Sequence, residues 1–170
     1  SSLIVGLDSS DPRSYCAARA GLREWLPQAG EADAAAMFRA YRAFYRDGVG
    51  ATYRRFQAAA EPFARDVLRW AVASGPAGAE EYLDRNPAVR QALGAWIECG
   101  FRITEQEGEL YPAGDAAVFM EFARFLPRDL AAYVAFRNRE DAQEWLGDAH
   151  IRIPWGDLLR RLSRWESFAR

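Results

Sequence analysis

The chain has no lysine, one histidine (His150) and two cysteines (Cys16 and Cys99). The lack of lysine excludes Schiff-base chemistry and a lysine-dependent phosphate-binding loop. One histidine excludes a metal site with two histidine ligands, and two cysteines are too few for a zinc knuckle within one chain. Chemistry here would depend on carboxylates, hydroxyl groups, arginines and one imidazole. We therefore expect no metal ion and no cofactor.

Long apolar runs are missing as well. No stretch approaches the roughly 18 apolar residues that span a bilayer. No charged segment followed by an apolar core, the pattern of a secretory signal, opens the sequence. We therefore expect a soluble, cytoplasmic protein without a membrane partner. The two cysteines lie far apart in the sequence, and we interpret them as reduced, buried small side chains instead of a disulfide.

The residues that are present suit one folded domain. Half of them are hydrophobic and 14% are aromatic, which is enough apolar surface for an independent core at this length. All 22 basic residues are arginines, and with abundant alanine and glycine they indicate a GC-rich bacterial source. We expect a single helical domain over residues 1–170, either whole or part of a longer chain, with a subdomain break near 74–78.

Apolar residues recur at helical spacing along most of the chain. We expect an all-α fold, an irregular bundle of about seven to nine short helices without a sheet, in which a degenerate helical repeat stays open. Helix starts are predicted at Asp11–Pro12 and Asn86–Pro87, because a capping side chain followed by proline favours the first helical turn. A last helix is predicted from Trp155.

Glycine and proline mark the predicted ends of helices. Gly48 and Gly50 are predicted to end the helix that carries an aromatic stripe. Pro62 is predicted to kink the next helix or to begin a new one. The polar segment Thr104–Pro112 is predicted to be a loop, and one more short helix is expected over 138–147.

Three patterns resemble parts of catalytic or metal sites, and each has a simpler structural interpretation. Asp148 or Glu144 could orient His150 as a general base, but no nucleophile motif accompanies it. The segment 8–11 resembles the end of a phosphoryl-transfer strand, but it lacks a glycine-rich loop. One acidic group lacks the full spacing of a calcium loop; its members are Glu98, Glu105, Glu107 and Glu109. We expect no catalytic residue, and we favour a non-enzymatic protein while the enzymatic alternative stays open.

Arginines form three groups that could contact nucleic acid. They are Arg39, Arg42 and Arg46; Arg54 and Arg55; and Arg160, Arg161 and Arg164. The first and third groups have the spacing of one helix face, as a recognition helix would. The formal net charge of −2 and the pI of about 5.5 give no general attraction for a polyanion. Nucleic-acid binding is therefore only the second alternative.

Aromatic and arginine residues together are typical of protein interfaces. We assign Tyr41, Arg42, Tyr45 and Arg46 to an exposed edge of the second helix. Trp155 is a further candidate, because helical spacing lets one of the two tryptophans of the last helix face outwards.

Charge is uneven along the chain. Residues 76–125 carry nine acidic side chains against four arginines. Glu105, Glu107 and Glu109 in this region could steer a basic partner towards the protein. We therefore add these three glutamates to the candidate interface.

The preferred function is a non-enzymatic protein-binding module of a bacterial protein, such as an immunity-type inhibitor, an adaptor or an accessory domain. The alternative is a small-ligand-binding or enzymatic helical domain, with an aromatic and arginine-lined pocket for an anionic or aromatic ligand. A preformed cavity with converging polar groups would favour the alternative. A solid core with a flat aromatic patch would favour protein binding.

Overall fold

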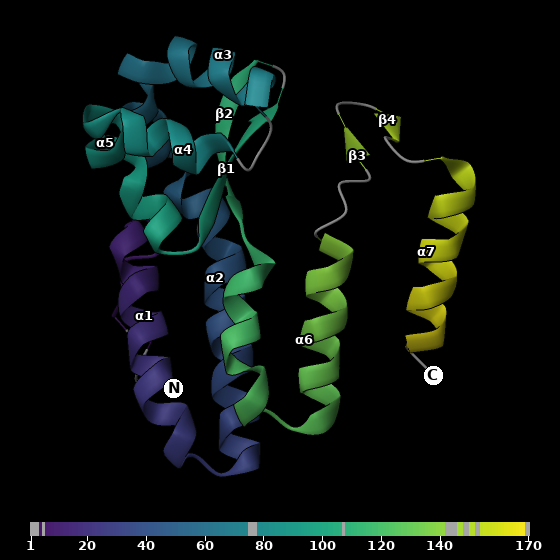
Figure 1. Cartoon of the computed structure of the whole chain (residues 1–170). Helices are drawn as coiled ribbons and strands as arrows, with labels where there is room; N and C mark the ends of the chain where they lie inside the picture. Colours follow the sequence, from purple (N-terminus) through teal and green to yellow (C-terminus); the bar gives the residue numbers. More distant parts are fainter. Residues whose placement is uncertain are drawn as a thin grey trace.

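The computed structural model describes residues 4, 6–74, 78–106, 108–141, 146–147, 150–151 and 154–168 (Figure 1). This part of the chain contains seven α-helices, three 3-10 helices and two antiparallel pairs of short strands. In chain order they are α1 (Pro12–Trp25), η1 (Leu26–Gln28), α2 (Glu31–Ala60), η2 (Glu61–Phe63), α3 (Ala64–Ser74), α4 (Gly78–Arg85), α5 (Pro87–Glu98), β1 (Phe101–Gln106), β2 (Glu109–Gly114), η3 (Ala116–Phe125), α6 (Arg128–Asp141), β3 (Leu146–Gly147), β4 (His150–Ile151) and α7 (Trp155–Phe168). The predicted all-α irregular bundle is confirmed, whereas the expected absence of a sheet is wrong.

Helix α2 is a long central helix against which α1, α5, β2 and η3 pack (Figure 1). Helix α1 packs along α2, strand β2 lies against it, and η3 contacts both α2 and α6. Helices α3, α4 and α5 gather with the hairpin at one end of α2, while α7 is the outermost helix, beside α6. No helix in the described ranges combines the length and the apolar character needed to cross a bilayer.

Helix α2 continues through both glycines that the sequence predicts as its end. A Cβ atom built on Gly48 would lie 2.0 Å from the hydroxyl oxygen of Tyr15, so this glycine lets a fully buried ring reach the helix backbone. Gly50 has no neighbour within 4 Å. A glycine inside a helix costs only about 0.5–1 kcal/mol relative to alanine, and tertiary packing outweighs that cost. The helix ends at Ala60 instead, and Pro62 separates it from α3 as predicted.

The segment predicted as a loop forms the β1–β2 hairpin. Its strands pair from Phe101 opposite Gly114 to Gln106 opposite Glu109. Alternate residues face the core, as the period of two in a strand requires; those buried on this face are Phe101, Ile103, Leu110 and Pro112. Gly108 has a φ of +78° in the turn, a conformation that favours glycine.

A disulfide joins Cys16 of α1 to Cys99, the residue that follows α5. The two Cα atoms lie 4.7 Å apart although the residues are separated by 83 positions in the sequence. The interpretation of the cysteines as reduced thiols is therefore wrong. Helices α1 and α5 pack against each other, which brings the two side chains together.

The predicted helix starts are confirmed, although the Asn86 side chain does not cap α5. The Asp11 carboxylate accepts a hydrogen bond from the Arg13 backbone N–H at 3.0 Å, and α1 begins at Pro12. Helices α5 and α7 begin at Pro87 and Trp155, also as predicted. Of the separate helix predicted over 138–147, residues 138–141 are helical but form the end of α6, and residues 146–147 form a strand, so the prediction of a separate helix is wrong. Residues 142–145 of that prediction lie outside the described residues, as do residues 75–77 of the predicted break.

Candidate functional site

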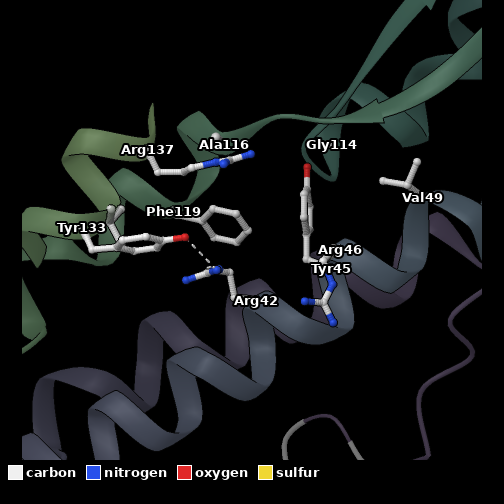
Figure 2. Close-up of a pocket in the computed structure, with 10 residues that line it drawn as sticks. Arg42, Tyr45, Arg46, Val49, Gly114, Ala116, Phe119, Tyr133 and Arg137 are labelled. Carbon is white, nitrogen blue, oxygen red and sulfur yellow. Dashed lines mark hydrogen bonds between the residues drawn. The ribbon is translucent and has the colours of Figure 1, made fainter. Parts of the chain in front are cut away.

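A pocket of about 350 Å³ opens between α2, η3 and α6, beside the end of β2 (Figure 2). Its lining comprises Arg42, Tyr45, Arg46 and Val49 from α2, Gly114 from β2, Ala116 and Phe119 from η3, and Tyr133, Val134 and Arg137 from α6. The volume is near the lower end of the range of about 300–1,000 Å³ for small-molecule sites. The pocket is therefore large enough for a compact organic molecule.

Three arginines make this pocket electropositive. The half-buried Arg42 donates a hydrogen bond to the Tyr133 hydroxyl at 3.1 Å, and its guanidinium carbon lies 4.8 Å from the centroid of that ring. Arg46 is exposed and pairs with Asp47 at 3.1 Å, an arrangement that contributes little in water. Arg137 reaches the pocket from α6. The lining, all of it within the described residues, contains no aspartate or glutamate.

Aromatic rings supply the apolar part of the pocket. The rings of Tyr45 and Phe119 lie 5.1 Å apart in an edge-to-face arrangement. The Tyr45 hydroxyl accepts a hydrogen bond from the Asp115 backbone N–H at 3.0 Å. Burial raises the pKa of Tyr45 far above its ordinary value, so the hydroxyl stays neutral and does not offset the arginine charges. A Cβ atom at Gly114 would lie 3.1 Å from the Tyr45 ring, which makes this position suited to glycine.

Helical spacing brings these side chains to one place. Arg42, Tyr45, Arg46 and Val49 follow each other at steps of three, one and three, which places them on one face of α2. On α6 the residues at 133, 134 and 137 repeat that spacing. In Figure 2 Arg42 from α2 and Arg137 from α6 lie on either side of the Phe119 ring, with the Arg42 guanidinium turned towards the Tyr133 hydroxyl, while Arg46 points away from them. The arrangement can hold a negatively charged group next to an apolar ring.

The structure brings together three of the residues that the sequence assigns to an interface, namely Arg42, Tyr45 and Arg46. The predicted exposed edge of tyrosines is nevertheless wrong, because Tyr41 and Tyr45 are only 1% and 2% exposed. Both rings contact Phe119, and the Tyr41 ring also contacts Phe122. Tyr41 is therefore a core residue, and Tyr45 reaches the pocket through one side of its ring.

The remaining candidate residues lie elsewhere. Trp155 begins α7 and is 66% exposed. Glu105 and Glu109 stand on opposite faces of the hairpin, because Glu105 is paired with Leu110 whereas Glu109 is paired with Gln106. The Glu105 carboxylate accepts from the Gly108 N–H, and the Glu109 carboxylate accepts from two tyrosine hydroxyls, those of Tyr53 and Tyr111. Glu107 lies outside the described residues.

Sequence reasoning missed Phe119, Tyr133 and Arg137. The spacing of four between Tyr133 and Arg137 was the available signal, since it places both on one face of a helix. Nothing in the sequence shows that this face of α6 lies opposite Arg42 of α2.

The other patterns singled out in the sequence are not part of the lining of this pocket. The Asp8 carboxylate accepts from Ser10 and pairs with Arg55 at 2.9 Å; the hydrogen bonds from Ser10 lower the pKa of Asp8. His150 lies in β4, and its side chain is outside the described part of the structure. A second cavity of about 320 Å³ lies beside Arg90. The carboxylates of Asp84 and Glu98 flank this arginine, so the second cavity has no excess of positive charge.

No group of three or more histidine, cysteine, aspartate or glutamate side chains in the described ranges is placed to hold a metal ion. Comparisons with protein families, with curated proteins and with solved structures found no match for this chain. A function therefore has to be inferred from the pocket and from the surface of the molecule itself.

Proposed function

We propose that this domain binds a small organic anion in the pocket between α2, η3 and α6. The observation that carries the proposal is the placement of Arg42 and Arg137, together with the exposed Arg46, around a cavity of about 350 Å³ whose lining contains no acidic residue. Guanidinium groups bind carboxylate and phosphate oxygens through paired, charge-assisted hydrogen bonds. The rings of Phe119 and Tyr45 offer an apolar surface for the rest of the ligand.

The ligand that fits this chemistry has an oxyanion at one end and a flat apolar body. A free inorganic anion would leave the aromatic wall unused, and a neutral aromatic molecule would gain no charge-assisted hydrogen bond from the arginines. Phenyl phosphate, benzoate and phenol test these requirements because they share one ring and differ in the charged group. We expect the two anions to bind and phenol to bind at least tenfold more weakly, because charge-assisted hydrogen bonds contribute about 1.5–3 kcal/mol each.

Isothermal titration calorimetry with these three compounds checks the proposal. The Arg42→Gln variant removes one pocket cation and should weaken phenyl phosphate about tenfold. Arg39→Gln is the matched control, because Arg39 is exposed on the same helix and is not part of the lining. The proposal is wrong if neither anion binds at millimolar concentration, or if the two variants weaken binding equally.

A specific observation favours protein binding as the second candidate. Helix α7 exposes an apolar stripe formed by Trp155, Leu159 and Leu162, which are 66%, 49% and 51% exposed. Exposed aromatic and aliphatic side chains in a continuous stripe are typical of helix-in-groove contacts. An immunity-type inhibitor, an adaptor and an accessory domain of a bacterial protein would all use such a surface.

The test of this second candidate compares the wild-type chain with a Leu159→Ser/Leu162→Ser variant. A protein that is retained by the wild-type chain and lost with the variant would support binding through the stripe. Changing Glu105, Glu107 and Glu109 together to glutamine separately tests electrostatic steering, which predicts a lower association rate at low salt. An unchanged rate would exclude the glutamates from that role.

The disulfide bears on the compartment in which the protein functions. The sequence predicts a cytoplasmic protein, but disulfides persist mainly in oxidising compartments and are rare where thiols are kept reduced. The Cys16–Cys99 bond therefore supports an oxidising location in place of the cytoplasm. Thiol titration of the denatured protein, isolated from its native source under thiol-blocking conditions, would detect no free thiol if this is right and two if the protein is cytoplasmic.

A further inference from the structure

Helix α6 contributes to two contacts at once. Its residues Tyr133, Val134 and Arg137 line the pocket. Three residues of α6 at steps of three and four contact α7, namely Tyr133, Phe136 and Glu140. Tyr133 therefore takes part in both contacts. Because both sets of residues belong to one short helix, a shift of α6 at the α7 contact also shifts its residues that line the pocket.

The contact between α6 and α7 is built from aromatic rings. Phe136 meets Trp165 edge to face at a centroid distance of 4.6 Å, and it stacks on Phe168 at 4.6 Å. Such pairs contribute beyond the apolar area that they bury. These rings join the last turns of α7 to α6, and Figure 1 shows the two helices side by side.

A buried carboxylate fixes the position of α7 along α6. Glu140 is only 1% exposed and receives two hydrogen bonds from Arg164, at 2.8 and 3.2 Å. Arg161, also buried, pairs with the same carboxylate at 3.3 Å. A buried charge needs its partners in place, so these ion pairs favour the arrangement in which Arg161 and Arg164 reach Glu140.

Two pocket residues are contacted directly by rings of α7. The Arg137 guanidinium carbon lies 5.7 Å from the centroid of the Trp165 ring, within the range of a cation–π interaction. The Tyr133 ring lies 6.2 Å from Phe168, and its hydroxyl accepts the hydrogen bond from Arg42. Through these contacts α7 reaches two residues of the pocket lining, Tyr133 and Arg137, without lining the pocket itself.

We propose that α7 positions the ligand-binding wall of the pocket, with Trp165 acting as a positioning residue for Arg137. The inference rests on the proposed function and deepens it, because it states how that site is regulated. Arginine has many rotamers, and a ring that restricts the side chain in advance lowers the entropy lost when an anion binds. Affinity for the anion therefore depends on the docking of α7, and by linkage a bound anion favours the docked helix.

The experiment measures the dissociation constant of phenyl phosphate for the full chain by isothermal titration calorimetry. Trp165→Leu should raise the dissociation constant about 3- to 10-fold, the factor expected from losing one cation–π contact. Trp155→Leu is the matched control, since Trp155 is exposed on the same helix, and it should leave the constant unchanged. Trp165→Phe keeps a ring and should give an intermediate value.

A double-mutant cycle separates positioning from general support. If Trp165 acts through Arg137, the Trp165→Leu/Arg137→Gln variant should bind no more weakly than Arg137→Gln alone. Additive losses would overturn the inference, as would equal constants for Trp165→Leu and Trp155→Leu. If Trp165→Leu fails to fold by circular dichroism, Trp165→Phe combined with Arg137→Gln completes the same cycle.

The two proposals fail in different ways. A wild-type chain that binds neither phenyl phosphate nor benzoate overturns the pocket and, with it, the role of α7. A wild-type chain that binds them with an affinity insensitive to Trp165 overturns only the role of α7. Slower amide exchange along 155–168 in saturating phenyl phosphate is the reciprocal effect that linkage requires, and unchanged exchange there would contradict it.

Discussion

Replacing Gly48 with alanine tests the packing at the centre of the fold. The new Cβ atom would lie 2.0 Å from the hydroxyl oxygen of Tyr15 and 2.2 Å from the ring carbon that bears it. Ordinary van der Waals contact begins near 3.4 Å, so the ring has to move by more than 1 Å. Tyr15 is fully buried, stacks on Phe44 at 4.5 Å and donates a hydrogen bond to the carbonyl of Ser9.

Three effects set the expected magnitude for Gly48→Ala. Overpacking a filled core costs about 1–3 kcal/mol, and loss of the Tyr15 hydrogen bond adds about 1 kcal/mol. The better helix propensity of alanine offsets about 0.8–1 kcal/mol of this. The free energy of unfolding should therefore fall by about 2 kcal/mol. Gly50→Ala has the same propensity gain and meets no atom within 4 Å, so that variant should be more stable by about 0.5–1 kcal/mol.

Urea unfolding followed by tryptophan fluorescence measures both variants. With a slope of about 2 kcal/mol/M, the midpoint should fall by about 1 M for Gly48→Ala and rise by about 0.3–0.5 M for Gly50→Ala. The opposite signs at two positions of the same helix form the diagnostic result. If Gly48→Ala is as stable as the wild type, the tight approach of Tyr15 to α2 is not what the structure indicates.

Two further substitutions test the covalent and ionic links. Cys16→Ser/Cys99→Ser opens a loop of 83 residues and should lower the unfolding free energy by about 4–5 kcal/mol in urea; a loss below about 1 kcal/mol would contradict this. Glu140→Gln leaves two buried or half-buried arginines without their carboxylate and should cost about 3 kcal/mol. Hydrogen bonding from Arg164 lowers the pKa of Glu140 from its ordinary value of 4.5. Its stabilising effect is therefore complete above that value and disappears as the pH falls through the lowered pKa. The measurement is the free energy of unfolding in urea at a series of acidic pH values. If it falls no more steeply with decreasing pH for the wild type than for Glu140→Gln, the role of the carboxylate is contradicted.

Local chemistry explains which parts of the fold can be predicted. The starts of α1 and α5 depend on a proline within the first turn, and in α1 on the Asp11 cap that precedes it, so a few adjacent residues are sufficient. The course of α2 through Gly48 depends on Tyr15, a residue of another helix, and no local signal reveals it. The hairpin was not recognised because its tip is rich in glutamate and glycine. Phe101 and Ile103 in one strand, and Leu110 and Pro112 in the other, nevertheless alternate as a buried strand face requires.

The candidate site shows the same division. Arg42 and Arg46 are recognisable as a stripe because they lie one turn apart on α2. Arg137 joins them only because η3 and α6 fold back over that helix, which is a property of the tertiary structure. The disulfide is a similar case, since the proximity of Cys16 and Cys99 results from the packing of α1 against α5.

The disulfide also divides the chain into a ring and an arm. Residues 16–99 form a covalently closed ring that contains α2, whereas β1, β2, η3, α6 and α7 follow it as an open arm. The pocket lies on the boundary, with Arg42 and Arg46 on the ring and Arg137 on the arm. Beyond the peptide bond after Cys99, only noncovalent packing holds the arm to the ring, and the fully buried Phe101 and Phe122 belong to that packing. The pocket therefore exists only while this packing is intact, even though the disulfide keeps the ring closed.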